Sequence, residues 1–212
     1  MGIKLLNFLV DGKSSESIFI LAHGAGAPMD SEWMSSFAKE LAKHQIKVIR
    51  FEFPYMIERR ETGKKRPPNT KKVLIQTWVD VYNKVKADHP KTPLFIGGKS
   101  MGGRIASLVT DELMPAGLIG LGFPFHAPGK DVGDRIDHLE NIQTKSLIIQ
   151  GTRDSMGSKI DCLNYDLSKN IEIFWLEDGD HSWKPRKKSG LSLDEHMLTA
   201  AKKVKYFIKE NK

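Results

Sequence analysis

The sequence contains one cysteine, Cys162, among 212 residues. A single thiol cannot form an internal disulfide and cannot complete a zinc site by itself. The chain therefore lacks the disulfide framework that stabilises small secreted domains, and we expect a cytoplasmic protein.

Long hydrophobic runs are also absent. An apolar stretch over residues 5–10 stops at Asp11, which makes it too short for the core of a secretory signal, and no small-residue cleavage pattern follows it. No other part of the chain approaches about 18 consecutive apolar residues. We therefore expect neither a cleaved leader nor a membrane span.

Compositional bias is weak: hydrophobic residues make up 40% of the chain, charged residues 28%, and 18 glycines stand beside 10 prolines. Such a composition excludes collagen-like and disordered classes and predicts a globular protein. The length favours a single domain over residues 1–212, without an interdomain linker or an internal repeat. The net charge of +7 and the pI near 9.3 leave an anionic partner to be tested.

Short apolar runs that alternate with longer segments of helical period are the main structural signal. The runs predict strands over residues 4–10, 17–22, 47–53, 93–97, 117–121, 146–150 and 172–175. Helices are expected over residues 31–44, 70–88 and 101–113, in a short segment before His138, and from Leu193 onward, where Ser192 and Glu195 form a capping box. This order predicts an α/β fold with a doubly wound, mostly parallel sheet of about seven strands and helices on both faces.

Residues 54–69 form the longest stretch without a period, and we expect a surface loop there. No insertion is long enough to make a separate lid domain.

Residues 98–102, GKSMG, match the pattern Gly-x-Ser-x-Gly. The short pattern is weak by itself, but here it follows an apolar strand and opens a helical segment, which is the setting of a nucleophile elbow. Glycines on either side of Ser100 allow the strand and the helix to pack closely around the turn. The helix N-terminus would then direct amides at negative charge that forms beside Ser100.

The same residues resemble the end of a phosphate-binding loop, Gly-x4-Gly-Lys-Ser/Thr. That motif would need a glycine where the chain has Pro93, and it would replace the phosphate-binding loop with the apolar strand 94–96. Because a central strand uses its amides in the sheet, the spacing argues against a nucleotide site.

A nucleophilic serine needs a base and a carboxylate that orients the base, and in this kind of fold they follow in the order serine, acid, histidine. Asp154 follows the strand 146–150 and His181 follows the strand 172–175, so both fall at carboxyl ends of strands. Asp161 is the nearest substitute for the acid, whereas Asp178 and Asp180 are expected to shape the turn that carries the histidine.

An oxyanion hole is predicted after the strand 17–22, where residues 23–27 read HGAGA. The backbone amide of Ala25, with Gly26 as the alternative, would pair with that of Met101. His23 precedes this turn and is expected to hold it by hydrogen bonds.

These segments, HGAG at 23–26, GKSMGGR at 98–104, QGTRD at 150–154 and DHSW at 180–183, together resemble the α/β-hydrolase superfamily. They are particularly similar to its small lidless members, the dienelactone-hydrolase-like branch and related bacterial and testis-expressed predicted hydrolases. The resemblance covers nearly the whole chain. It implies a triad of Ser100, Asp154 and His181 that acts on esters or thioesters without a cofactor or metal. True dienelactone hydrolases usually carry a cysteine nucleophile, so Ser100 does not imply their substrate, and Trp183 stands where phenylalanine is expected.

Further residues are candidates for the pocket. Loops around Tyr55, Phe123, Phe125 and Trp183 would border a shallow site suited to small or short-chain acyl groups. His126 either lines the pocket beside Phe125 or lies in a solvated loop. The remaining histidines, His44, His89, His138 and His196, are expected at the surface, and no His or Glu pair has metal-ligand spacing.

Basic residues lie on either side of the candidate site. Lys99 is expected to be a solvated or stacking side chain, with attraction of an acidic substrate as the alternative. The basic segments 59–66 and 184–188 lack interleaved aromatics, so solvated surface is favoured and no nucleic acid is expected.

The sequence therefore predicts a serine hydrolase that forms an acyl-enzyme on Ser100 and acts on a small-molecule acyl substrate. A peptidase with the same triad and a non-catalytic interaction module with the same fold remain as alternatives.

Overall fold

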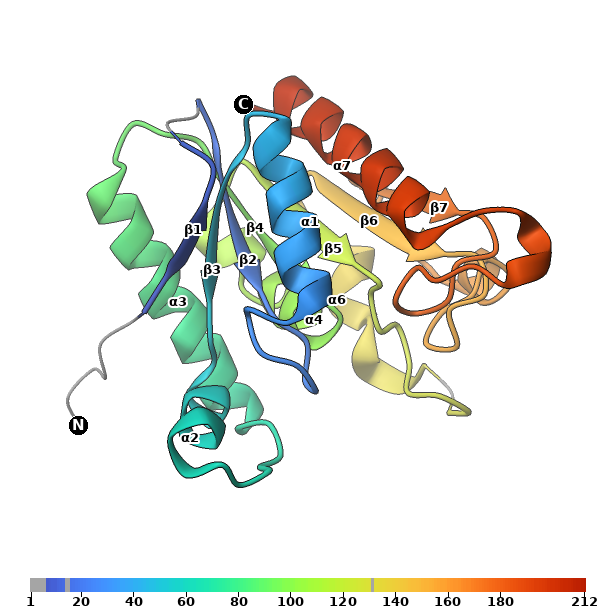
Figure 1. Cartoon of the computed structure of the whole chain (residues 1–212), viewed down its shortest axis with the longest axis horizontal. Helices are drawn as coiled ribbons and strands as arrows, with labels where there is room; N and C mark the ends of the chain where they lie inside the picture. Colours follow the sequence, from blue (N-terminus) through green and yellow to red (C-terminus); the bar gives the residue numbers. More distant parts are fainter. Residues whose placement is uncertain (1–6, 14–15, 131) are drawn as a thin grey trace.

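The computed structural model describes residues 7–13, 16–130 and 132–212. Seven strands form one sheet in the order β1-β3-β2-β4-β5-β6-β7 (Figure 1). The strands are β1 Leu9–Asp11, β2 Ile18–Ala22, β3 Lys47–Phe51, β4 Leu94–Lys99, β5 Gly117–Leu121, β6 Ser146–Gly151 and β7 Ile171–Leu176. All neighbouring pairs are parallel except β1 and β3, so the predicted α/β fold with a mostly parallel sheet is confirmed.

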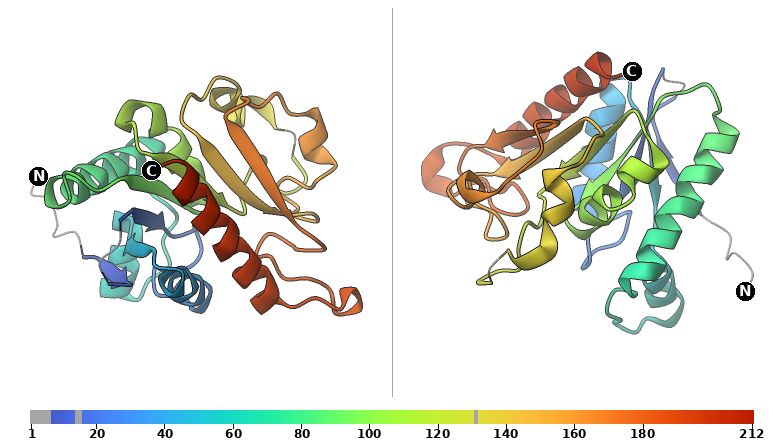
Figure 2. Two further views of the ribbon diagram at one scale, coloured as in Figure 1. Left: turned by 90° about the horizontal axis from the view of Figure 1, so that it is seen from above. Right: turned by 180° about the vertical axis from the view of Figure 1, so that it is seen from behind.

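Helices cover both faces of this sheet. They are α1 Glu32–Lys43, α2 Pro54–Thr62, α3 Lys71–Asp88, α4 Met101–Ser107, α5 Thr110–Leu113, α6 Asp137–Glu140 and α7 Leu193–Glu210, with short 3-10 turns at Gly133–Arg135, Asp161–Asn164 and Lys187–Ser189. Figure 1 shows α1 and α7 in front of the sheet, and the view from behind in Figure 2 shows α3, α4 and α6 on the other face. No helix in the described ranges is long and apolar enough to cross a membrane.

Two apolar clusters explain this layering. Along β2, Ile18 and Ile20 face the cluster that contains Trp78 of α3, whereas Phe19 and Leu21 face the cluster of α1 and α7. Successive side chains of a strand point to opposite faces, so a strand that is apolar throughout is buried on both sides. The apolar runs in the sequence therefore marked the central strands correctly.

Several predicted boundaries change in the structure. Residues 101–113 form two helices, α4 and α5, instead of one, and the first strand begins at Leu9 within the described residues, while positions 4–6 of its predicted range lie outside them. The last helix begins as expected, because the Ser192 hydroxyl accepts a hydrogen bond from the Glu195 amide and the Glu195 carboxylate accepts one from the Ser192 amide.

The predicted surface loop at residues 54–69 is the main correction. Its first half is helix α2, which begins with Pro54 at its first position and ends at Gly63 in a left-handed conformation with φ of 68°. Proline suits the first helical turn because that amide needs no partner, and glycine suits the left-handed end. No separate lid domain is present in the described part of the chain.

Candidate active site

Ser100 lies on a sharp turn between β4 and α4. Its φ and ψ are 51° and −119°, an unusual conformation for a residue with a side chain, and its amide donates to the Leu121 carbonyl at 2.9 Å. A Cβ atom on Gly102 would lie 2.6 Å from the His23 carbonyl oxygen, and one on Gly98 would lie 2.6 Å from the Ala22 oxygen. Both glycines are therefore required for the close packing around Ser100.

The structure brings Ser100, Asp154 and His181 together from the carboxyl ends of β4, β6 and β7. The His181 Nε2 atom lies 2.9 Å from Ser100 Oγ, and Nδ1 lies 2.8 Å from Asp154 Oδ2. Because an ionised carboxylate can only accept, Nδ1 carries the proton and Nε2 is free to accept the serine proton. The side chain of Asp154 is fully buried, while that of His181 is 27% exposed.

Asp154, and not the substitute Asp161, is the carboxylate that contacts His181. The Oδ1 atom of Asp154 accepts a hydrogen bond from the Met156 amide at 2.8 Å. Asp161 instead accepts from the Ser158 amide at 2.8 Å and lies 3.6 Å from Nε2 of His126.

Gln150 is a residue of the site that sequence reasoning missed. This fully buried amide at the end of β6 accepts from the Phe123 amide at 2.6 Å, and its Nε2 lies 3.0 Å from the Phe123 carbonyl and 2.9 Å from Asp154 Oδ2. It therefore ties the loop after β5 to the carboxylate. A glutamine at the end of the otherwise apolar strand 147–150 was the available signal, because buried amides need partners.

The segment 23–27 is held at its start by His23. The buried His23 lies with Nδ1 2.6 Å from the Gly24 carbonyl and accepts the Phe53 amide on Nε2 at 3.1 Å, and burial lowers the pKa of this imidazole. The structural role predicted for His23 is confirmed by these bonds. Ala25 is exposed, and Met101 is the first residue of α4, where the amide has no intrahelical acceptor.

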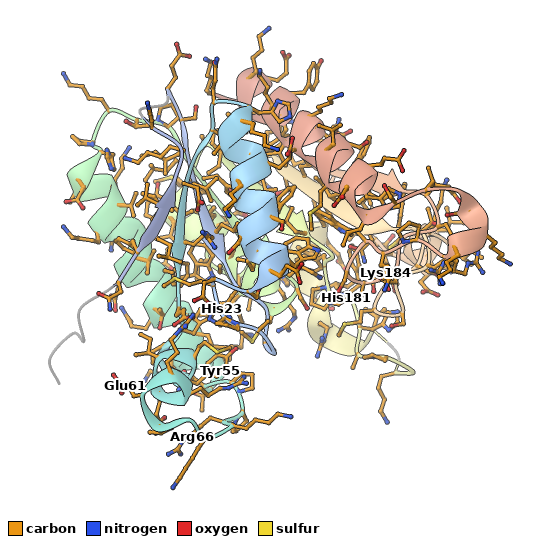
Figure 3. All side chains as sticks on the ribbon, in the orientation of Figure 1. His23, Tyr55, Glu61, Arg66, His181 and Lys184 are labelled. Carbon is orange, nitrogen blue, oxygen red and sulfur yellow. The ribbon has the colours of Figure 1, made fainter. Side chains whose placement is uncertain are left out.

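Helix α2 contacts the same segment from the outside. The Tyr55 hydroxyl donates to the Ala25 carbonyl at 2.9 Å, and the Arg59 guanidinium lies 3.4 Å from the Gly26 carbonyl. Arg60 forms a bidentate ion pair with the buried carboxylate of Glu52 at 2.7 to 2.9 Å. Arg59 thus contacts the loop of Ala25 directly, whereas Arg60 is paired with a carboxylate that follows β3. Figure 3 shows Tyr55 beside His23 at this end of the molecule.

The four aromatic residues whose loops are expected to border the pocket have buried side chains. Phe123, Phe125 and Trp183 have no exposed surface, and Tyr55 is 1% exposed. Tyr55, Phe123 and Phe125 pack in the apolar cluster on one face of the sheet, whereas Trp183 packs in the cluster on the other face.

The remaining candidate residues differ in how deeply they are buried. Gly26 is exposed, and a Cβ atom at this position would have no neighbour within 4 Å. His126 is partly buried, with Nδ1 2.9 Å from the Ala127 carbonyl. His196, expected at the surface, is 5% exposed and lies 2.6 Å from the Trp183 carbonyl through Nδ1.

Of the two expectations for Lys99, a solvated or a stacking side chain, the structure disagrees with the solvated one, whereas the ammonium lies over an aromatic ring. Lys99 is only 9% exposed, and its Nζ atom donates to the His181 carbonyl at 2.6 Å and lies 5.5 Å from the centre of the Trp33 ring. Burial outweighs the attraction of Asp154 and Asp180 and lowers the pKa of this ammonium to about 8.

The turn that carries His181 is shaped by two carboxylates, as the sequence predicted. Asp180 accepts the amides of Ser182 and Lys184 at 2.8 and 2.9 Å. Asp178 pairs with Arg186 and with Arg153, and the hydrogen bonds from Arg186 lower the pKa of its carboxyl to about 2.

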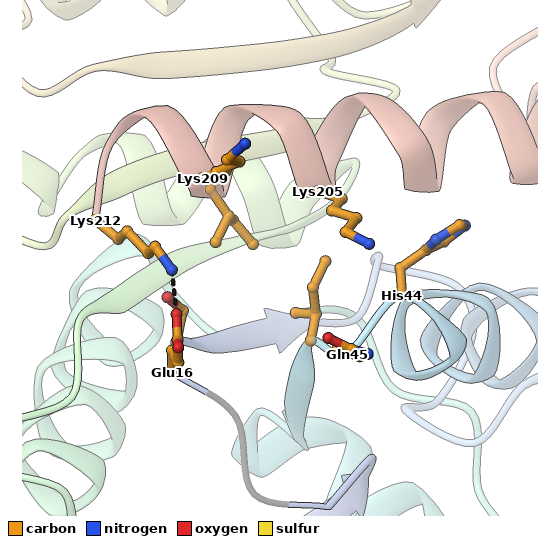
Figure 4. Close-up of a pocket in the computed structure, with 9 residues that line it drawn as sticks. Glu16, His44, Gln45, Lys205, Lys209 and Lys212 are labelled. Carbon is orange, nitrogen blue, oxygen red and sulfur yellow. Dashed lines mark hydrogen bonds and ion pairs between the residues drawn. The ribbon is translucent and has the colours of Figure 1, made fainter.

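A separate cleft of about 350 Å³ lies at the opposite edge of the sheet (Figure 4). Lys205, Lys209 and Lys212 of the C-terminal segment line it, beside the residues that precede β2 and β3. Parallel sheets place their sites at the carboxyl ends of strands, and this cleft contains none of the triad, oxyanion-loop or pocket residues described above. The described residues contain no group of three metal-ligating side chains that could hold an ion.

Comparison with known proteins supplies a family. Residues 15–209 match the family described as alpha/beta hydrolase domain. Among solved structures, an alpha-beta serine hydrolase homologue from Coxiella burnetii is 19% identical, with 93% of this chain and 91% of that chain covered and a TM-score of 0.72.

Two further structures share the fold. A dienelactone hydrolase from Anabaena variabilis is 14% identical over 97% of this chain and 92% of its own, with a TM-score of 0.75. A serine hydrolase without a lid from Xanthomonas campestris is 18% identical over 93% of this chain and 88% of its own, with a TM-score of 0.66. At these identities the likeness shows a common architecture, and the chemistry has to be argued from the site.

Proposed function

This chain belongs to the alpha/beta hydrolase family, and on that premise we propose that it is a serine hydrolase that cleaves a small or short-chain carboxylic ester or thioester. The observation that carries the proposal is the imidazole of His181, which bridges Ser100 Oγ at 2.9 Å and Asp154 Oδ2 at 2.8 Å. A serine, a base and an orienting carboxylate in hydrogen-bond contact form the arrangement that activates a hydroxyl for acyl transfer.

In the first half of the reaction, His181 Nε2 takes the proton of Ser100 Oγ as the oxygen attacks the substrate carbonyl. The amides of Met101 and Ala25 would stabilise the oxygen that becomes negative, an interaction worth about 3 kcal/mol of barrier for one donor. The imidazolium then gives its proton to the leaving alcohol or thiol, and the acyl group remains on Ser100 as an ester.

In the second half, water gives a proton to His181 and attacks the acyl carbonyl. The tetrahedral intermediate collapses, Ser100 Oγ recovers a proton from the imidazolium, and the carboxylic acid leaves. Asp154 accepts a hydrogen bond from the Nδ1–H group of His181 throughout and stabilises the imidazolium without being protonated itself.

Exposure around the site supports a small acyl group. Ala25 and Gly26 are exposed, while Phe123 and Phe125 are buried with their rings packed against each other. Such a site offers little enclosed apolar surface for a long chain, and the neighbouring serine hydrolase from Xanthomonas campestris is likewise described as having no lid.

A fluorophosphonate probe tests the proposal, because it phosphonylates an activated serine irrespective of the natural substrate. We expect an intact-mass shift of the wild type and none for Ser100→Ala. A wild type that stays unlabelled, or a Ser100→Ala variant that is labelled equally, would show that the chain is not a serine hydrolase and would favour an interaction module. A panel of nitrophenyl esters, acyl-CoA thioesters and peptide amides then separates esterase, thioesterase and peptidase.

A further inference from the structure

The segment that carries His181 has a strained backbone. Asp178 and Trp183, on either side of the histidine, have φ values of 55° and 68°. Left-handed conformations of residues with side chains are costly, and they persist only where surrounding contacts hold them. The position of the imidazole therefore depends on what fixes this segment.

Three side chains hold three successive carbonyl groups of this segment. Lys99 Nζ donates to the carbonyl of residue 181 at 2.6 Å, Trp33 Nε1 to that of residue 182 at 3.1 Å, and His196 Nδ1 lies 2.6 Å from that of residue 183. These side chains come from β4, α1 and α7, so the segment is anchored to three elements of the core. The ammonium of Lys99 is the charged donor among the three, and charged donors form the stronger hydrogen bonds.

Lys99 also differs from the other two anchors because it precedes the nucleophile. Residues 99 and 100 both contact His181: Lys99 contacts its backbone carbonyl, and Ser100 contacts its ring at 2.9 Å. Space for the ammonium depends on Gly122, where a Cβ atom would lie 2.6 Å from the His181 carbonyl oxygen and 2.8 Å from Nζ. A displacement of the end of β4 would therefore move Ser100 and the backbone of His181 together.

We propose that Lys99 is a positioning residue, whose ammonium fixes the backbone of His181 so that the imidazole stays within hydrogen-bond distance of Ser100. This inference rests on the proposed function, because it assigns Lys99 a task in the activation of that serine. It replaces the alternative that Lys99 attracts an acidic substrate, since a side chain that is 9% exposed and bonded to a carbonyl presents little charge to solvent.

The environment of Lys99 adds a dependence on pH. Asp154 and Asp180 are the charged groups that attract the ammonium, and the Trp33 ring covers it, yet burial dominates and lowers the pKa to about 8. Above this pH the neutral amine donates a weaker hydrogen bond to the His181 carbonyl. Activation of Ser100 should therefore decline above about pH 8.

The rate of fluorophosphonate labelling, measured on the full chain from pH 6.5 to 9.5, tests the inference without a known substrate. We expect the wild-type rate to fall above about pH 8. Lys99→Met, of similar length and without charge, should label at least about tenfold more slowly at pH 7, because misplacement of a base by a fraction of an ångström is costly. Its rate should show no alkaline decline.

Three control variants distinguish the positioning role of Lys99 from a general effect of lost charge and from the loss of any one anchor. Lys184→Met removes an exposed lysine three residues from His181 and should follow the wild-type profile. Trp33→Phe removes an anchor that does not titrate, so it should lower the rate but keep the alkaline decline. Lys99→Gln, which retains a neutral donor, should recover part of the rate without the decline.

The outcomes are distinct. A wild type that is never labelled at Ser100 overturns the proposed function and this inference with it. A labelled wild type together with a folded Lys99→Met protein of equal rate and identical pH profile overturns the inference alone. If neither Lys99 variant folds, the wild-type profile decides, because a rate that stays constant between pH 8 and 9.5 contradicts a titrating anchor.

Discussion

Replacement of Lys99 by methionine should slow the activation of Ser100. It should also change how the free energy of unfolding depends on pH. Lys99→Met keeps the length and the apolar stem of the side chain and removes only the buried ammonium. The ammonium is bonded to the His181 carbonyl at 2.6 Å but has lost most of its hydration. Such a group is costly to bury, and its replacement by an apolar residue of similar volume is often neutral or stabilising.

The magnitude follows from the lowered pKa of this lysine. In the unfolded chain the pKa is near 10.5, and in the folded protein burial lowers it to about 8. At 1.36 kcal/mol for each pKa unit, the folded state at pH 7 carries a cost of about 3 kcal/mol for the charged form. Between pH 8 and 10.5 the unfolded chain binds more protons than the folded one, so the free energy of unfolding of the wild type rises with pH relative to the variant.

Urea unfolding followed by tryptophan fluorescence at pH 7, 8, 9 and 10 measures this difference. At pH 10 the burial of Lys99 costs only about 1 kcal/mol. Between pH 7 and 10 the free energy of unfolding of the wild type should therefore rise by about 2 kcal/mol relative to that of Lys99→Met. Lys184→Met, at an exposed position, should show no such change. Parallel pH dependences of the wild type and Lys99→Met would refute the reasoning, because they would mean that the buried ammonium is not destabilised by its surroundings.

Two further predictions concern the contacts that hold the acid and the oxyanion loop. Gln150→Leu leaves the buried Phe123 amide without its acceptor and removes one donor to Asp154 Oδ2, so it should lower the free energy of unfolding by about 2 kcal/mol and slow fluorophosphonate labelling; an unchanged urea midpoint would contradict this. Tyr55→Phe removes the hydrogen bond to the Ala25 carbonyl, so it should cost about 1 kcal/mol of stability and lower kcat for a nitrophenyl ester with KM unchanged; an equal loss in KM would mean that Tyr55 binds substrate.

The residues of the proposed triad could be located from the sequence because fold topology determines their place. Parallel strands end at one edge of a sheet, so Ser100, Asp154 and His181, which follow three different strands, had to meet there once the strands were identified. The strands were identifiable because a sequence such as LIIQ at 147–150 is buried on both faces. Even the choice of Asp154 over Asp161 depended on its place directly after the strand.

Helix α2 could not be recognised because it is polar on most of its surface. Its buried residues are Tyr55 and Met56 alone, so no apolar period extends through the segment. The capping signals were present, with proline at position 54 and glycine at position 63, but they enclose nine residues without an apolar stripe. The helix is stabilised by tertiary contacts, such as the ion pair of Arg60 with Glu52, whose partners are not adjacent in the sequence.

The roles of the basic residues depended on long-range contacts in the same way. In the sequence, Lys99 and Arg60 are simply two positive charges. In the structure, Lys99 contacts the carbonyl of residue 181, whereas Arg60 contacts the carboxylate of Glu52. Partners of these two cations are settled by the fold: β4 carries Lys99 to the turn of His181, and α2 returns Arg60 to the end of β3. Both cations therefore have partners within the chain, which weakens the argument from net charge to an anionic substrate.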